Sequence, residues 1–367
     1  MKIKTITCHE VYNYGASLQE YALLKVLEDL GHDVEAVHYK PDYLSNQFKL
    51  DRVSPKYKSF PIKYIYLLAK LPGRFKALKR KRAFDTFSKK FIKTGEKVYT
   101  NNEELKVNLP EADAYICGSD QIWNSFFPNG KDPAFYLDFV PPSKLKISYA
   151  ASFAIDKISE DLKPFVKEKV KRINHVSVRE TSGITILEGL GIKNAVQVLD
   201  PVFLLSAKYW ETTFVKPINE NYILVYDFDS NPLIKKIAIK LKKEKGFKIY
   251  TVNKNIKYAD KNFYLEGPEC FLSLVYHSQF NITNSFHAIA FSLIFEKQFV
   301  VVNRNEEINT RMRDLLGLVN LSHLLVKENE FDNSKFVLNP INSFVKINEL
   351  LDESIERSKN FLKSALN

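Results

Sequence analysis

The sequence NITNSFHAIAFSLIFE, residues 281–296, has the pattern of a strand end, a turn and a helix. Residues 280–283 predict the end of a buried strand, and Asn284 predicts the turn that follows it. Ser285 stands at the predicted helix N-cap, where its hydroxyl can accept a hydrogen bond from the first turn. The apolar residues that follow recur at i, i+3, i+4, i+7 and i+8 and predict one buried helix face: Phe286, Ile289, Ala290, Leu293 and Ile294.

His287 falls in the first turn of this predicted helix, beside free backbone N–H groups and the positive end of the helix dipole. That position suits an anion, a phosphate in particular. The turn of a strand–turn–helix unit also lies at the carboxyl end of the strand, where α/β sheets bind their ligands. The alternative is an ordinary helix start that carries a polar residue and binds nothing. The segment alone leaves both interpretations open.

The chain of 367 residues is long for a single core, so two domains are expected. A hydrophobic content of 45% indicates a globular protein. No run of about 18 apolar residues occurs, so no membrane-spanning helix is predicted. The start, MKIKTITCHE, lacks the apolar core of a signal peptide. Cys8, Cys117 and Cys270 lie far apart in the sequence, which favours reduced thiols in a cytoplasmic protein over a disulfide or a zinc site.

The net charge of +11 allows nucleic acid, an anionic membrane or an acidic substrate as partner. Neither a zinc-finger spacing nor an RNA-binding aromatic signature is present, so no nucleic-acid partner is predicted. The basic residues are concentrated in residues 74–93, which hold nine of them and a single acid, Asp85. Phenylalanines are interleaved with them. This pattern predicts either a solvated helix on the domain surface or a surface for anionic lipid head groups, with peripheral attachment to the inner face of the membrane.

Alternating strand and helix patterns run along the chain and predict an α/β fold with two successive domains. The first domain, 1–205, has predicted strands at 3–8, 33–39, 112–117, 146–151, 176–178 and 196–199, with a basic helical insertion at about 40–108. The second, 206–367, has strands at 222–226, 248–252, 280–283 and 299–302, and closes with a helix over about 341–366. Neither a dinucleotide-binding GxGxxG motif nor a P-loop follows any of these strands.

A second polar turn, GSDQIWN, follows the predicted strand 112–117. Gly118 allows a sharp turn, after which polar side chains gather beside an aromatic ring. Sugars are bound by such sets, because planar polar groups pair with hydroxyls while an aromatic face covers the ring. The alternative is an Asx-turn beside a half-buried Trp. We predict acceptor binding in the first domain by six residues of this turn and of the first strand–helix turn: Asn13, Gln19, Ser119, Asp120, Gln121 and Trp123.

Arginines follow two other predicted strands. Arg179 stands at a strand end beside Glu180, where it forms either a plain ion pair or a bidentate grip on a carboxylate or phosphate. Arg304, Arg311 and Arg313 follow the strand at 299–302, and the predicted winding brings some of them near His287. His9, His32 and His38 are isolated in the sequence, and no spacing of His, Asp and Glu suggests a metal site.

Together these motifs resemble the polysaccharide pyruvyl transferase family. The resemblance is carried, in order, by NYGASLQ at 13–19, GSDQIWN at 118–124, SVRE at 177–180, Asp200-Pro201, TNSFH at 283–287 and Arg311-Met312. It spans nearly the whole chain. The combination of GSDQ-x-WN with SFH is specific, although each alone is weak. The usual SFHG of this branch is SFHA here, a mild departure at Ala288.

The resemblance implies two Rossmann-like domains facing across a cleft, as in GT-B glycosyltransferases. It implies that phosphoenolpyruvate, a co-substrate, supplies a pyruvate ketal that bridges two hydroxyls of one sugar, usually on a lipid-linked glycan precursor. Carried over to this sequence, it makes His287 and Arg179 the catalytic residues. We further expect Ser285, Arg304 and Arg311 to bind the donor in the second domain, without a metal or another cofactor.

Two rival functions remain. The first is a glycosyltransferase that uses a nucleotide sugar on the same architecture. Retaining enzymes of that kind often place two glutamates eight residues apart, whereas here Glu296 is followed eight residues later by Arg304. The second is a basic membrane-associated binding protein without activity, which would tolerate changes in the SFH and GSDQ turns.

Overall fold

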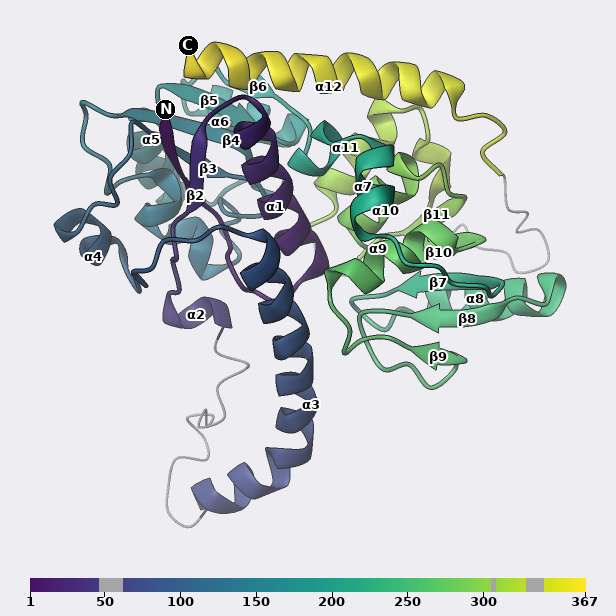
Figure 1. Ribbon diagram of the computed structural model, residues 1–367. Coiled ribbons are helices and arrows are strands. Elements are labelled where there is room, and N and C mark those ends of the chain that lie inside the picture. The colour runs from purple at the N-terminus through teal and green to yellow at the C-terminus, as the bar shows by residue number, and fades with distance from the viewer. Residues whose placement is uncertain (46–61, 305–307, 328–339) are drawn as a thin grey trace.

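The first half of the chain forms a six-stranded parallel sheet in the computed structural model, which describes residues 1–45, 62–304, 308–327 and 340–367 (Figure 1). Its strand order is β2-β1-β3-β4-β5-β6. Central strands such as AYICG are buried at every residue, as expected where helices cover both faces of a parallel sheet. The strands are β1 (Lys2–Ile6), β2 (Asp33–Ala36), β3 (Ala114–Gly118), β4 (Leu145–Ala151), β5 (His175–Val178) and β6 (Val196–Gln197).

The second half forms another six-stranded parallel sheet, in the order β12-β11-β10-β7-β8-β9. The short edge strands β9 and β12 were not predicted from the sequence. The predicted α/β fold with two Rossmann-like domains is therefore confirmed. The strands are β7 (Tyr222–Tyr226), β8 (Lys248–Thr251), β9 (Lys261–Asn262), β10 (Phe280–Thr283), β11 (Phe299–Val302) and β12 (Leu325–Val326).

Helices connect the strands of both sheets. The first half contains α1 (Tyr14–Asp29), α2 (Asp42–Ser45), α3 (Ile62–Phe91), α4 (Asn102–Val107), α5 (Lys163–Val170) and α6 (Thr181–Gly189). The second contains α7 (Ala207–Phe214), α8 (Pro232–Lys245), α9 (Pro268–His277), α10 (Phe286–Ile294), α11 (Thr310–Leu318) and α12 (Val345–Leu366).

The predicted basic insertion contains the long helix α3, which extends away from the two sheets like an arm (Figure 1). Only its end near the sheets is anchored, where Phe84 and Phe87 are buried. Residues 46–61 of the predicted insertion lie outside the described residues.

The two halves share a hydrophobic core, because one cluster of buried side chains continues from α1 into α9 and α10. Tyr14 stacks on Phe271 with ring centres 5.1 Å apart, and its hydroxyl donates to the carbonyl of Val252. Arg80 of α3 lies at the same junction, where its guanidinium donates to the carbonyls of Tyr12 and Tyr264. The base of the arm thus forms part of the contact between the two halves.

The last helix, α12, begins at Val345, a few residues after the predicted start, and crosses both halves (Figure 1). Its Ser358 hydroxyl accepts a hydrogen bond of 2.9 Å from the backbone N–H of Leu199, in the first half. The ring of Phe361 lies 6.3 Å from that of Tyr149 on β4. The C-terminal helix therefore packs its end against the first half.

Candidate active site

A cavity of about 310 Å³ lies between the two halves. Its walls come from the carboxyl ends of strands in both sheets, the edge at which α/β sheets bind ligands. The first half contributes residues that follow β1 and β3, including Asn13, Asp120 and Gln121. The second contributes residues that follow β7, β10 and β11, as well as the start of α11: Phe228, Asn284, Ser285, Phe286, His287, Arg304, Ile308, Arg311 and Met312.

The turn after β10 has the geometry predicted from its sequence. Ser285 is the N-cap of α10, and its hydroxyl accepts from the N–H of Ala288 at 3.4 Å. His287 is buried in the wall of the cavity. Its ring lies against Gly15 of α1, where an added Cβ would stand 1.9 Å from Nδ1 of the imidazole. The starts of α1 and α10 therefore meet at a contact that only glycine allows.

Asp200 lies at the centre of the buried charges. Its Oδ2 is 3.4 Å from Nε2 of His287, accepts from the Ser119 hydroxyl at 3.2 Å and pairs with the guanidinium of Arg179. Burial opposes ionisation of this carboxyl, but Arg179 and His287 together lower its pKa well below the ordinary value. Asp200 is therefore a carboxylate that holds His287 and Arg179 in place.

Two buried arginines, Arg179 and Arg311, lie against the ring of Phe286. Their guanidinium carbons lie 4.8 Å and 5.5 Å from its centre. Burial and the charge of Arg179 lower the pKa of Arg311 to about 10, which indicates that positive charge is crowded here. Asp120 compensates in part, with its Oδ1 3.6 Å from Nη1 of Arg311.

Both arginines keep unused hydrogen-bonding capacity. The Nε atoms of Arg179 and Arg311, and Nη2 of Arg179, are buried and find no hydrogen-bond partner among the residues that the structure describes. Leaving a buried donor without a partner costs about 1–3 kcal/mol, and more for a charged group. Such a pair of cations is suited to an anionic ligand.

The other arginines that follow β11 differ in where they lie. Arg304 lines the cavity, with its guanidinium carbon 4.6 Å from the ring centre of Phe228. Arg313 is on the outside of α11 and pairs with Asp156 at 2.8 Å. Arg304 and Arg311 are thus brought to the cavity with His287, and Arg313 is not.

Of the six predicted acceptor-binding residues, Asn13, Asp120 and Gln121 line the cavity. The side chain of Asn13 also caps α1, since its Oδ1 accepts from the N–H of Gly15 at 3.0 Å. Gln121 accepts from Asn124 at 2.7 Å. Asp120 lies closer to the arginines than predicted, because its turn faces them across the cavity.

Gln19, Ser119 and Trp123 are not brought to the cavity, because all three are fully buried and none of them lines it. Gln19 donates to Thr7 and to the carbonyl of Ala16. Trp123 stacks flat on Tyr136 and donates to the carbonyl of Phe135 at 3.0 Å. These side chains instead hold the turns that carry Asn13, Asp120 and Gln121.

The order and spacing of these residues match a known family. The profile described as "Polysaccharide pyruvyl transferase" matches residues 13–306, which include both polar turns and Arg179 but not Arg311. The chain belongs to the polysaccharide pyruvyl transferase family. A comparison with curated protein sequences found no match.

Solved structures similar to this family member were also found. UGT89C1 of Arabidopsis thaliana has a TM-score of 0.50 at 11% identity, with 98% of each chain covered. The UDP-GlcNAc 2-epimerase of Methanocaldococcus jannaschii has a TM-score of 0.48 at 12% identity, covering 99% of this chain and 100% of that one. At such identities the likeness concerns the fold alone.

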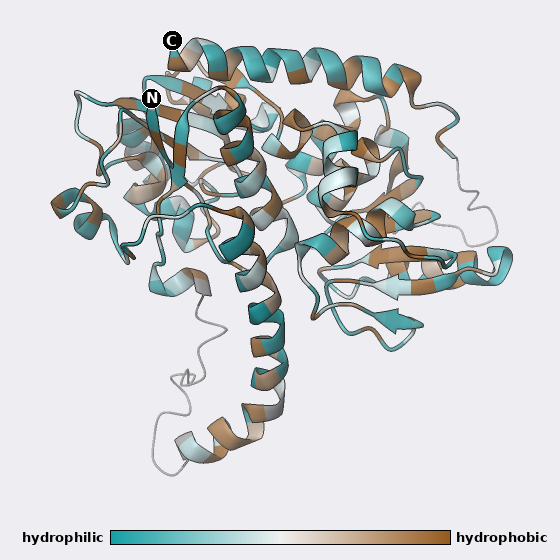
Figure 2. Ribbon diagram, viewed as in Figure 1, coloured by the Kyte–Doolittle hydropathy of each residue, from teal (hydrophilic) through white to brown (hydrophobic). Residues whose placement is uncertain are grey.

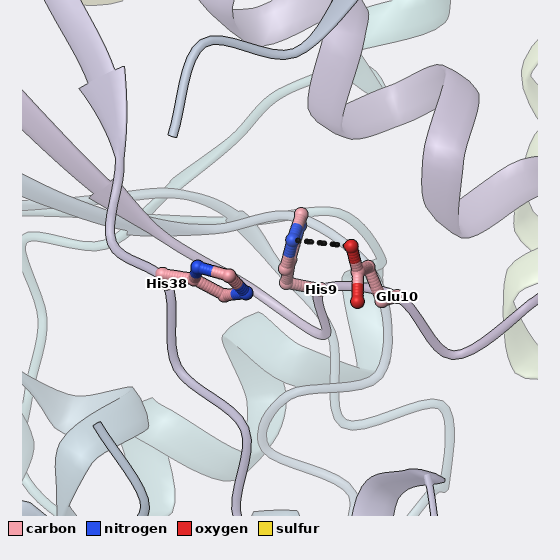
Figure 3. Close-up of side chains that lie close together, drawn as sticks. All are labelled: His9, Glu10 and His38. Atoms are coloured by element: carbon pink, nitrogen blue, oxygen red, sulfur yellow. Dashed lines mark ion pairs between the residues drawn. The ribbon is translucent and has the colours of Figure 1, made fainter. Parts of the chain in front are cut away.

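Two residues of this site and one cluster beside it were not predicted from the sequence. Phe286 belongs to the predicted apolar helix face, yet both arginines lie against its ring. Asp200 had no predicted role beyond its place in a motif. His9 and His38 are isolated in the sequence, but the structure brings their ring centres to 5.3 Å, with Glu10 beside them (Figure 3). They follow β1 and β2, neighbouring parallel strands whose order in the sheet the sequence does not give.

No membrane-crossing element was found: among the residues described, none of the helices of this family member is both long and apolar enough to span a bilayer.

Proposed function

We propose that the protein transfers the three-carbon unit of phosphoenolpyruvate to two hydroxyls of one sugar, as a pyruvate ketal. The observation that carries this proposal is the pair of buried arginines with unpartnered donors, next to His287 at the start of α10. Family membership supports transfer to a polysaccharide or its precursor. The proposed reaction needs no cofactor besides phosphoenolpyruvate as co-substrate.

Phosphoenolpyruvate carries a carboxylate and a phosphate on neighbouring atoms, so it requires two cationic groups close together. Arg179 and Arg311, which both lie against Phe286 and beside Asp120, meet that requirement, and planar guanidinium groups can grip each anionic group bidentately. We assign Arg304 and the N-cap turn at Ser285 to the same donor site, since both line the cavity. The N-terminus of α10 adds partial positive charge for the phosphate.

The proposed reaction adds and then eliminates at C2 of the donor. A proton is added to C3, and the oxygen of the first sugar hydroxyl bonds to C2, which has become oxocarbenium-like. The C2–O bond to phosphate then breaks, and its electron pair leaves with inorganic phosphate. The second hydroxyl bonds to C2 and closes the ketal. One hydroxyl proton balances the proton added to C3, and the other leaves with the phosphate or to solvent.

His287 is the group proposed to move these protons, since an imidazole titrates near neutral pH. Asp200, at 3.4 Å from its Nε2, orients the ring. The arginines stabilise the leaving phosphate electrostatically. Asn13, Asp120 and Gln121 on the opposite wall are proposed to bind the acceptor sugar, which we propose to be lipid-linked.

Isotope labelling tests the reaction class. With ¹⁸O at the bridging oxygen of phosphoenolpyruvate, C–O cleavage delivers the label to the released phosphate, and a panel of sugar and lipid-linked acceptors can be screened by phosphate release. Label retained in the organic product would instead mean P–O cleavage and a different reaction. A thermal shift with nucleotide sugars but none with phosphoenolpyruvate would favour the glycosyltransferase alternative.

The arm α3 is proposed to bring this enzyme to the cytoplasmic face of an anionic membrane, where a lipid-linked acceptor would lie. Towards its outer end, hydrophobic side chains are exposed to solvent: Tyr64 54%, Ile65 63%, Leu68 65% and Phe75 63% (Figure 2). Ile65, Leu68 and Phe75 fall on one helical face, and the exposed Lys79 and Arg82 continue it towards the sheets. Helices that bind a bilayer surface insert apolar side chains into it and attract anionic lipid head groups with basic side chains.

Substitution of the exposed basic residues Lys76, Lys79 and Arg82 by Gln tests this role. Each exposed basic residue near an anionic surface contributes about 1 kcal/mol, so binding to anionic vesicles should weaken strongly, and more so in low salt. Arg80 is left unchanged because it holds the junction between the two halves. The matched control neutralises Lys236, Lys243 and Lys245 of α8, which removes the same charge elsewhere. Equal vesicle binding by both triple variants would refute the role of α3.

A further inference from the structure

His9, Glu10 and His38 come together because β1 and β2 are neighbouring parallel strands. The residues that follow each strand therefore lie at the same edge of the sheet. His9 and Glu10 follow β1, and His38 follows β2 (Figure 3). Figure 3 shows the two imidazole rings on adjacent segments, with the carboxylate of Glu10 beside His9.

The three side chains can offer ligand atoms to a single ion. One ligand atom from each lies within 4.8 Å of the other two. The Nε2 of His9 is 3.5 Å from a carboxylate oxygen of Glu10. Tetrahedral Zn²⁺ with bonds of about 2.0–2.1 Å separates its ligand atoms by about 3.3 Å. His9 and Glu10 thus already have nearly the right spacing, and His38 offers a third ligand atom within 4.8 Å of both.

The surroundings of His9 resemble those of a metal-bound histidine. The buried carboxylate of Glu20, on α1, accepts from Nδ1 of His9 at 2.8 Å. A metal-binding histidine almost always donates its second ring N–H to such a carboxylate, which fixes the tautomer and the ring orientation. With Nδ1 engaged in this way, Nε2 is the atom directed at Glu10.

His38 supplies an independent observation. Its Nε2 is buried and has no hydrogen-bond partner within the described part of the chain. Buried polar atoms are nearly always satisfied, so an unpartnered imidazole nitrogen next to a second imidazole and a carboxylate requires an explanation. Lys40 pairs with the other oxygen of Glu10 and can hold that carboxylate in place.

We propose that His9, Glu10 and His38 bind one divalent transition-metal ion, with Zn²⁺ the best match to two imidazoles and a carboxylate. The site goes beyond the proposed transferase chemistry, in which it has no role. It fixes the loop between β1 and α1, which also carries Asn13 in the wall of the cavity. Glu20 is a positioning residue for this site, since it acts through His9.

Metal binding by the full chain tests the proposal. The protein is treated with a chelator, titrated with Zn²⁺, desalted and analysed for bound metal. One equivalent is expected for the wild type. His38→Gln should lower the Zn²⁺ affinity at least about 10-fold, while His32→Gln, the matched control at the surface of the same half, should leave it unchanged. Equal uptake by all three proteins, or none by any of them, would overturn the proposal.

Two further measurements keep the test decisive. Co²⁺ bound through nitrogen and oxygen gives only weak visible bands, so an intense near-ultraviolet thiolate band would assign the metal to a cysteine and refute the site. If His38→Gln does not fold, Glu10→Gln replaces it, and unchanged Zn²⁺ affinity in that variant would refute the proposal. A failure to turn over phosphoenolpyruvate would count against the proposed transferase function but not against the metal site, because this experiment measures metal binding.

Discussion

The turn after β3 and the turn after β10 both follow an interior strand of their sheet and both reach the cavity, but they use their side chains differently. In the β3 turn, Ser119 donates to Asp200, and Trp123 and Asn124 form contacts within the first half. Only Asp120 and Gln121 remain to line the cavity. Most side chains of this turn therefore support the wall of the cavity and do not line it.

In the β10 turn, the side chains reach across to the other half. His287 lies beside Asp200 and against Gly15, and Phe286 packs against Arg179 of the first half and Arg311 of the second. Polar turns at the carboxyl ends of strands in two parallel sheets can thus either support a site or complete it. The comparison predicts that changes in the β10 turn act on the rate and changes in the β3 turn act on acceptor binding.

His287→Gln is the strongest test of this contrast. Glutamine keeps the approximate size and some hydrogen bonding but cannot carry a proton at neutral pH. Turnover should fall by about 10²–10⁴-fold, the usual contribution of a general acid–base group, while phosphoenolpyruvate still binds. Steady-state rates and a separate binding titration measure the two effects.

His277→Gln, at the end of α9 and outside the cavity, is the control and should keep the wild-type rate. If the His287→Gln enzyme turned over as fast as the control, His287 would have no catalytic role and would be only a structural residue at the start of α10.

Arg311→Lys and Arg313→Lys form a matched pair on one helix, α11. Lysine keeps the charge but loses the planar fork that binds an anion bidentately. Loss of one charge-assisted hydrogen bond costs about 1.5–3 kcal/mol, so Arg311→Lys should weaken phosphoenolpyruvate binding by about 10–100-fold. Arg313→Lys, whose side chain pairs with Asp156 on the surface, should change it little. Similar losses in both variants would remove Arg311 from the donor site.

Most strands and helices were predictable because local signals agreed with the tertiary structure. Helix α8 begins and ends at such local signals, with Asn231 as the N-cap, a proline at its start and Gly246 in the left-handed conformation after its end. Strand β6, by contrast, was predicted to be longer than the two residues observed. The chain leaves the sheet there because Asp200 turns inward to the arginine and histidine.

The candidate site was predictable only to the extent that ligands bind at strand ends. His287, Arg179, Arg304 and Arg311 follow strands or begin the next helix, so their position in the sequence placed them near the cavity. The burial of Trp123, the contact of Phe286 with two arginines and the meeting of His9 with His38 depend on strand order and on tertiary packing. Neither is encoded in a local pattern, which is why these features required the structure.

Gln121→Ala is the mildest test, directed at the wall that the β3 turn builds. The side chain lines the cavity, and its Oε1 accepts from Asn124. Loss of one hydrogen bond to an acceptor hydroxyl costs about 0.5–1.5 kcal/mol, so the apparent KM for the acceptor should rise about 2- to 12-fold while that for phosphoenolpyruvate stays nearly constant. Asn124→Ala is the control. It removes the hydrogen-bond partner of Gln121, and Asn124 itself is buried and does not line the cavity. If Asn124→Ala reproduced the change in acceptor KM, Gln121 would act only through the shape of the turn. A larger effect on phosphoenolpyruvate than on the acceptor would move the donor to the first half and reverse the roles proposed for the two turns.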